Sequence, residues 1–188
     1  HGPLLIFAGA GSGKARVLTH RAAYLMKARG VSPRQILAVT FTNKAANEMR
    51  ERIARLVGQW PEMAEPEAAI SAEGRGMWIG TFHSMCARML RMDGQAIGLD
   101  KRFTIFDEHD QLTVVKLCLE DFGIPPDRLP AGRVLNTISL AKNELVGPRE
   151  FEQRAQNWYE QQVARLYLRY QSRLEENNAL DFDDLIMR

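Results

Sequence analysis

A glycine-rich loop between an apolar run and an amphipathic segment constrains the fold of this chain more than any other feature. Residues 4–8 are apolar, residues 9–13 read Gly-Ala-Gly-Ser-Gly, and Lys14 begins a segment whose apolar residues lie mostly on one helical face up to Gly30. In such a strand, loop and helix, backbone N–H groups of the loop converge on phosphate oxygens at the helix N-terminus, and the lysine bridges the β- and γ-phosphates. The pattern therefore predicts a phosphate-binding loop.

The residues expected to bind phosphate are Ala8, Gly9, Ala10, Gly11, Ser12, Gly13 and Lys14. The alternative is a glycine-rich turn with a surface lysine, but the position between a strand and a helix favours phosphate binding. The next residue should be Ser or Thr, whose hydroxyl ligates Mg²⁺, and Ala15 stands there instead. A methyl group cannot ligate a metal, so we expect nucleotide binding with weakened metal ligation and impaired turnover.

Two further strand-then-helix patterns follow in the first half of the chain. Residues 36–40 and 78–80 are expected to form buried strands, and residues 43–57 and 83–92 the helices after them. Together with the first pattern, they predict an α/β fold with a parallel sheet covered by helices.

The second half is expected to be almost purely helical after a short apolar run at residues 103–106. Asp107 should cap a helix that ends before Gly123, and further helices are predicted at residues 130–143 and 151–177. The last of these carries an apolar stripe that we expect in the core: Trp158, Val163, Leu166, Tyr170 and Leu174.

Aromatic and polar residues follow the second and third predicted strands. The two groups are Phe41, Thr42, Asn43 and Lys44, and Thr81, Phe82 and His83. Parallel strands bind ligands at their carboxyl ends, where phenylalanine can stack on a base and polar side chains can donate to phosphates. The alternative places Phe41 in the core and uses Thr42 or Asn43 as a helix cap. Two such groups at successive strand ends favour a groove for single-stranded nucleic acid.

Composition narrows the choice of partner and compartment. The net charge is +2, but residues 1–60 contain ten Lys and Arg against two acidic residues, which suggests a polyanionic partner or a solvated surface balanced elsewhere. Cys86 and Cys118 lack metal-ligand spacing, and no stretch is long and apolar enough to cross a membrane. The start also lacks the basic region of a signal peptide, so we expect a cytoplasmic protein with no metal ligated by protein side chains.

These residues together resemble the UvrD/Rep-type DNA helicases of superfamily 1. The matching motifs are AGAGSGKxRVLTHR, TFTNKAAxEMxxR, GTFHSxxxRxLR and the ALDFDDL at residues 179–185, and the resemblance covers essentially the whole chain. It implies that Lys14 is the catalytic lysine at the phosphates of ATP and that Arg16 packs on adenine. It also implies that the second and third motifs line the DNA groove, which gives DNA-binding roles to Phe41, Thr42, Asn43, Lys44, Thr81, Phe82 and His83.

The resemblance also implies a domain organisation. We expect a partial RecA-like phosphate-loop sheet at residues 1–85, an inserted, mainly helical subdomain at residues 86–176, and a segment at residues 177–188 that returns to the motor core. The implied cofactors are ATP and Mg²⁺, and the implied partners are single-stranded DNA and a duplex junction. The acid pair needed for hydrolysis does not occur before Arg188, so this chain alone is expected to be inactive in ATP turnover.

Three functions stay open from the sequence. The first is the N-terminal part of an ATP-dependent DNA helicase, which in the intact protein couples ATP hydrolysis to translocation and unwinding. The second is a module that binds nucleotide and DNA without hydrolysis, because of Ala15. The third, a small-molecule phosphotransferase, is disfavoured by the paired aromatic strand ends.

Asp181, Asp183 and Asp184 could suggest a metal site, but carboxylates at a helix start are expected to cap the helix.

Overall fold

The computed structural model describes residues 5, 7, 13–58 and 76–188. The chain divides into two compact units, His1–Met85 and Cys86–Arg188. The described elements mix helices with short parallel strands, as expected for an α/β fold.

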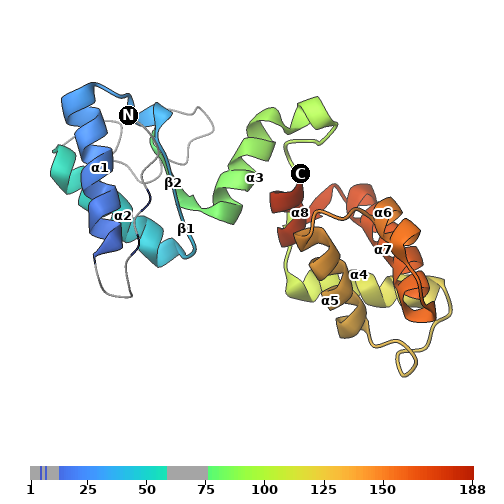
Figure 1. Ribbon diagram of the computed structural model, residues 1–188. Coiled ribbons are helices and arrows are strands. Elements are labelled where there is room, and N and C mark those ends of the chain that lie inside the picture. The colour runs from blue at the N-terminus through green and yellow to red at the C-terminus, as the bar shows by residue number, and fades with distance from the viewer. Residues whose placement is uncertain (1–4, 6, 8–12, 59–75) are drawn as a thin grey trace. The chain divides into compact units, whose positions relative to one another are not determined.

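Among the described residues of the first unit, two α-helices and two paired strands precede the start of a third α-helix (Figure 1). Helix α1 (Lys14–Arg29) ends at Gly30, whose φ of 65° is the left-handed conformation that glycine adopts without strain. A 3₁₀ turn (Pro33–Gln35) leads to β1 (Leu37–Thr40), which pairs in parallel with β2 (Trp78–Thr81). Helix α2 (Asn43–Val57) packs on α1 and β2.

The core of the first unit forms where α2 faces both α1 and the strands. Its buried members are Ala22, Met26, Ala46, Met49, Ile53, Met77 and Ile79. Residues 46, 49 and 53 recur at spacings of three and four, so one stripe of α2 supplies much of this cluster.

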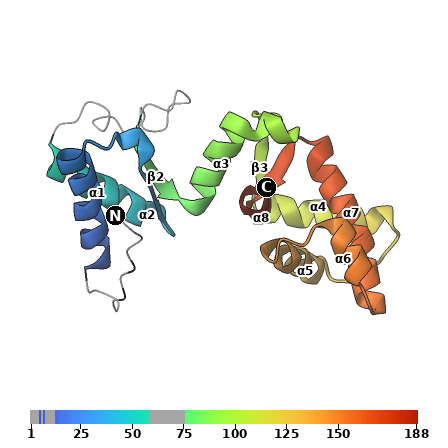
Figure 2. The same cartoon turned by 45° about the horizontal axis from the view of Figure 1, so that its top comes forward.

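Helix α3 (Phe82–Asp93) begins in the first unit and leads into the second. The elements that follow are a 3₁₀ turn (Gly94–Ile97), β3 (Thr104–Phe106), α4 (Glu108–Asp121), α5 (Ala131–Asn143), α6 (Pro148–Arg154), α7 (Trp158–Glu176), β4 (Ala179–Asp181) and α8 (Phe182–Met187). Strands β3 and β4 pair in parallel, which brings residues 104–106 beside residues 179–181 (Figure 2).

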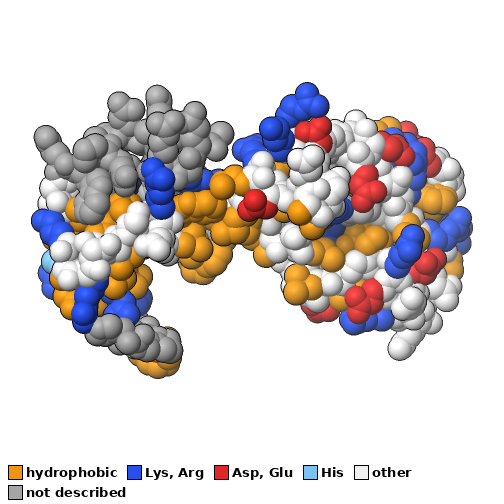
Figure 3. Space-filling view, turned by 90° about the horizontal axis from the view of Figure 1, so that it is seen from above, with side chains coloured by type: hydrophobic (Ala, Val, Ile, Leu, Met, Phe, Trp, Pro, Cys, Tyr) orange, Lys and Arg blue, Asp and Glu red, His pale blue; other side chains and the backbone are white. Residues whose placement is uncertain are grey.

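The surface of the second unit carries both signs of charge. In the space-filling view, basic and acidic side chains are interspersed over the lobe formed by this unit (Figure 3). Asp121 accepts from both Arg173 and Arg169, and these hydrogen bonds lower the pKa of its carboxyl group.

No helix in the described part of the chain is long and apolar enough to cross a membrane.

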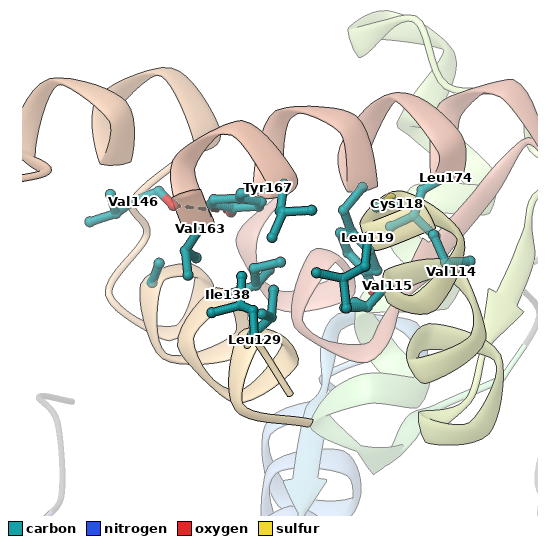
Figure 4. Packing of buried hydrophobic residues seen from close by; sticks show 14 of the residues in the cluster. Val114, Val115, Cys118, Leu119, Leu129, Ile138, Val146, Val163, Tyr167 and Leu174 are labelled. Carbon is teal, nitrogen blue, oxygen red and sulfur yellow. Dashed lines mark hydrogen bonds between the residues drawn. The ribbon is translucent and has the colours of Figure 1, made fainter. Parts of the chain in front are cut away.

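The core of the second unit lies between α4, α5 and α7 (Figure 4). Val115, Ile138 and Val163 contribute apolar side chains from the three helices, and the hydroxyl of Tyr167 donates to the carbonyl oxygen of Val146 at 3.1 Å. Cys118 is fully buried there, and burial raises the pKa of its thiol to about 11. A thiol in this environment is a packing group rather than a nucleophile.

Several predicted elements are confirmed. Helix α2 has the predicted bounds, and β1 and β2 lie within one residue of the predicted strands. The expectation that β1 is buried is wrong, because none of its residues is buried and Leu37 is 51% exposed. Asp107 caps α4 by accepting from the N–H of Asp110 at 2.9 Å, as its position before the apolar stripe indicates. The predicted first strand at residues 4–8 lies mostly outside the described residues.

The single long helix predicted at residues 151–177 is wrong, because the chain forms α6 and α7 instead. Ala155 leaves the helical conformation, and Asn157 starts α7 by accepting from the N–H of Glu160 at 3.0 Å. The break lets α6 fold back, so that Phe151 meets Tyr167 edge to face with 6.1 Å between ring centroids.

Trp158 is a second correction. It was expected in the core with the rest of the apolar stripe, but its side chain is 48% exposed, whereas Val163, Leu166, Tyr170 and Leu174 are buried. Because Trp158 is the first residue of α7, it lies beyond the helices that cover the later turns. The short strand β4 was not predicted at all.

Candidate functional site

Two aromatic side chains meet at the carboxyl ends of β1 and β2. In the parallel register Thr40 pairs with Thr81, so the next residues, Phe41 and Phe82, leave the sheet side by side. Their ring centroids are 5.5 Å apart, and the planes are tilted by 44°. Phe41 is 91% exposed and Phe82 is 42% exposed, so the pair forms an exposed apolar surface and is not part of the core.

The turn after β1 fixes the position of Phe41. The Thr42 hydroxyl accepts from the N–H of Ala45 at 3.2 Å and so caps α2, while the Thr40 hydroxyl donates to the Thr42 carbonyl at 3.0 Å. Capping by Thr42 is the alternative that the sequence allowed for this residue. It does not take Phe41 into the core, because the cap holds the phenylalanine between strand and helix with its ring outside.

The turn after β2 is equally constrained. The Thr81 hydroxyl accepts from the N–H of Ser84 at 3.2 Å, and the Ser84 hydroxyl donates to the Thr81 carbonyl at 2.9 Å. A Cβ at Gly80 would lie 2.5 Å from side-chain atoms of Ser84 and Met85. Glycine therefore allows α3 to begin immediately after the strand, which puts Phe82 next to Phe41.

Arg50, which sequence reasoning missed, connects the helix after Phe41 to the strand before Phe82. Its guanidinium donates to the Ile79 carbonyl oxygen of β2 at 2.9 Å and to the Asn47 side chain at 2.7 Å. The side chain therefore links α2 to β2, although an arginine on a helix gives no sequence signal for such a contact.

The remaining residues predicted to bind DNA surround the aromatic pair. Asn43 and Lys44 are exposed in the first turn of α2, and His83 is exposed in the first turn of α3. The structure thus brings all seven of the predicted residues to the ends of two adjacent strands. The arrangement offers two ring faces, two helix N-termini and a lysine, which together suit a stacked base and a nearby phosphate.

The phosphate-loop residues Ala8, Gly9, Ala10, Gly11 and Ser12 lie outside the described residues. Gly13 precedes α1 with a φ of 84°, and Lys14, Ala15 and Arg16 are exposed in its first turn. No acidic side chain occurs in that turn, so no carboxylate of the turn itself neutralises the positive end of this 16-residue helix. These residues fit a phosphate, whereas the Ala15 methyl does not fit an inner ligand of Mg²⁺.

A buried ionic cluster in the second unit was not predicted. The ammonium group of Lys142 on α5 lies 2.7 Å from a carboxylate oxygen of Asp181 and 2.9 Å from one of Asp184, and all three side chains are at most 3% exposed. Asp181 caps α8 by accepting from the N–H of Asp184 at 2.7 Å, so the expected capping role is confirmed and the ion pair adds to it.

Two polar side chains of α7 complete this cluster. The Tyr170 hydroxyl donates to Asp181 at 2.8 Å, and the Gln171 amide donates to Asp184 at 3.2 Å. Burial and the neighbouring Asp181 charge raise the pKa of the Tyr170 phenol well above its usual range, so it stays a donor. Within the described residues no group of three His, Cys, Asp or Glu side chains could hold a metal.

Comparisons with known proteins agree with the helicase-like motifs found in the sequence. A family described as the UvrD/REP helicase N-terminal domain matches residues 1–188. The ATP-dependent DNA helicase PcrA of Bacillus subtilis (strain 168) is 49% identical over 186 residues, which are 99% of this chain and 23% of that protein. PcrA of Staphylococcus aureus (strain Mu50 / ATCC 700699) is 48% identical over 186 residues, or 99% of this chain and 24% of that protein. The chain thus spans about a quarter of the length of these curated relatives.

Proposed function

The chain belongs to the UvrD/REP helicase N-terminal domain family, and on that premise we propose that it is the part of an ATP-dependent DNA helicase that binds ATP and single-stranded DNA. The observation that carries the DNA-binding proposal is the exposed Phe41–Phe82 pair at the ends of two parallel strands. In the intact protein, this 188-residue part helps to couple ATP hydrolysis to movement along one strand and to unwinding at a duplex junction.

Each group of residues has a separate role in this proposal. Phe41 and Phe82 stack on a base, while Thr42, the Lys44 side chain and the N–H groups of Asn43 and Lys44 contact the backbone phosphate beside it. Asn43, Thr81 and His83 contribute further polar contacts at the same edge. Stacking needs only a π-face and the phosphate contacts carry no sequence information, so recognition is nonspecific.

The nucleotide is placed at the start of α1. Lys14 and the backbone N–H groups of residues 8–14 hold the β- and γ-phosphates, and Arg16 packs on the adenine ring. Bound ATP supplies the free energy of phosphoryl transfer. We place the RecA-like motor core at residues 1–85, the helical insertion at residues 86–176 and the returning segment at residues 177–188.

Salt dependence tests the DNA-binding proposal. The 188-residue chain is titrated onto a fluorescently labelled oligothymidylate at several salt concentrations, with a labelled duplex as comparison. We expect saturable binding to the single strand, with an affinity that falls linearly on a log–log plot against salt because phosphate contacts release counterions. The absence of saturable binding at low salt would contradict the proposal.

Ala15 favours a second candidate function, in which the chain binds nucleotide and DNA without hydrolysing ATP. Phosphate donors remain in place, but the metal loses a hydroxyl ligand, so we expect weak ATP binding that depends only slightly on Mg²⁺. Ala15→Thr should make nucleotide binding clearly Mg²⁺-dependent and should leave turnover by this chain at background.

Calorimetric titration of ATP with and without Mg²⁺ measures this difference, with Lys14→Ala as the control that should abolish binding whether or not the metal is present. Equal Mg²⁺ dependence of the parent chain and the Ala15→Thr variant would show that this position does not reach the metal. DNA-stimulated ATP hydrolysis by the chain as it stands would contradict the expectation of inactivity.

A further inference from the structure

A pocket of about 200 Å³ opens on the second unit between the end of α4 and the start of α7. It is lined by Phe122, Gly123, Ile124, Pro125, Arg128, Trp158 and Gln162. It lies in a different unit from the Phe41–Phe82 pair and plays no part in the function proposed above.

The walls of the pocket are held by backbone hydrogen bonds. The N–H of Ile124 donates to the Leu119 carbonyl at 2.9 Å, and the N–H of Arg128 donates to the Pro125 carbonyl at 3.0 Å. Leu129, next in the chain, is 1% exposed and anchors this turn in the core of the second unit. The pocket is therefore formed in the free chain and needs little ordering to bind a ligand.

Two large aromatic side chains that line the pocket remain partly exposed to solvent. Trp158 is 48% exposed and Phe122 is 37% exposed. The Arg128 guanidinium lies 5.0 Å from the centre of the Trp158 ring, and that of Arg165 lies 4.8 Å from the centre of the Phe122 ring. Exposed tryptophan beside arginine is the composition that dominates binding energy at protein interfaces.

Charge in and around the pocket favours an acidic ligand. The lining contains Arg128 and no carboxylate, and the described part of the chain places no carboxylate within ion-pair distance of Arg128 or Arg165, whereas Arg169 and Arg173 are paired with Asp121. A guanidinium that stacks on a ring keeps its N–H edge available for a carboxylate.

Size and surroundings select the class of ligand. Cavities near 150 Å³ hold a benzene-sized group, so this pocket accepts one large apolar side chain and is smaller than a typical small-molecule site. Asp121 and Asp127 lie close in sequence to the lining residues, so the arginines beside the pocket are interrupted by acidic residues and do not form the continuous basic stripe that a nucleic-acid backbone needs.

We propose that this pocket binds a short acidic segment of a partner protein, which inserts one large apolar side chain between Trp158 and Ile124 and pairs flanking carboxylates with Arg128 and Arg165. The apolar side chain supplies the burial, and the two arginines select against basic segments.

The test uses the 188-residue chain and the capped peptide Glu-Glu-Phe-Glu-Glu, with Glu-Glu-Ser-Glu-Glu and Lys-Lys-Phe-Lys-Lys as matched controls. The readout is the ¹⁵N–¹H signal of the Trp158 indole, assigned by its loss in Trp158→Phe. We expect a saturable shift with the acidic phenylalanine peptide alone. Arg128→Met should weaken that binding about tenfold, because a charge-assisted pair is lost, whereas Arg149→Met on α6 should leave it unchanged.

Three outcomes would overturn the proposal. One is the absence of a saturable shift with the acidic phenylalanine peptide, and another is an equal response to the lysine peptide. The third is a shift of the Trp158 signal by a short DNA duplex at lower concentration than by the peptide, which would make the pocket a nucleic-acid contact. Because Trp158 and Arg128 lie at the surface, the variants are expected to keep the fold, and the unshifted spectrum of the remaining amides verifies this.

Discussion

Lys142→Met is expected to destabilise the second unit by about 3–5 kcal/mol, because it leaves Asp181 buried without its counterion and Asp184 with only the Arg188 guanidinium, 4.0 Å away. Methionine has nearly the volume of the lysine stem, so packing changes little and the loss is electrostatic. Asp181 and Asp184 keep their hydrogen bonds to the start of α8, but these bonds do not neutralise the charge. The unit should therefore open far more often.

Cys118 provides a local measure of that opening. Its side chain is fully buried in the core of the second unit, so a thiol reagent reaches it only when the core opens. In a Cys86→Ser background, we expect Lys142→Met to raise the labelling rate by roughly two to four orders of magnitude. Lys116→Met, an exposed lysine on α4, is the matched control and should leave the rate within a few-fold of the parent.

A comparison within the cluster separates charge from packing. Asp184→Asn keeps the shape of the side chain and leaves the Lys142–Asp181 pair intact, so its effect on labelling should be much smaller than that of Lys142→Met. If the two variants had equal effects, or if Lys142→Met were neutral, the carboxylates would not depend on Lys142 for their burial.

Phe41→Ala is expected to weaken single-stranded DNA binding by about 1–3 kcal/mol, the range measured when a stacked base loses its aromatic partner. Because Phe41 is 91% exposed, the substitution removes little buried surface and should not affect folding. The slope of affinity against salt should stay the same, since phenylalanine contacts no phosphate. The measurement is the oligothymidylate titration with both proteins over the same salt range.

Tyr24→Ala is the matched control for Phe41→Ala. Tyr24 is a 51% exposed aromatic residue of the same unit, but it lies within α1 and does not follow either strand. Its loss should not change the affinity. An equal effect of both variants would mean that general aromatic surface, rather than stacking at the strand ends, drives the binding.

The sequence predicted the first unit well where local and tertiary signals agree. In α2, the apolar spacing indicates residues 43–57, and the structure has these bounds, with Thr42 as the N-terminal cap and Gly58 after the last turn. The sequence also placed Phe41 and Phe82 at the ends of successive parallel strands, which end at a common edge of a sheet. The 5.5 Å contact itself depends on the register of Thr40 and Thr81, which no local pattern specifies.

The second unit was predicted less well, because the features that the prediction missed there depend on tertiary contacts. Lys142 occupies the apolar face of α5, four residues after Ile138 and eight after Val134, so its position signals a buried cation. The carboxylates that neutralise it lie near residue 181, and periodicity cannot connect the two segments. Trp158 fitted the stripe of α7 equally well, yet it lies before the turns that the other helices cover.

The most direct test of the account is to map where single-stranded DNA contacts the chain. Amide and aromatic NMR signals are recorded while an oligothymidylate is added to the isotope-labelled protein. We expect the largest shifts on Phe41, Thr42, Lys44, Thr81 and Phe82, at the ends of β1 and β2. Shifts confined to the second unit, or scattered over both units without a maximum at these strand ends, would contradict the proposed DNA-binding site.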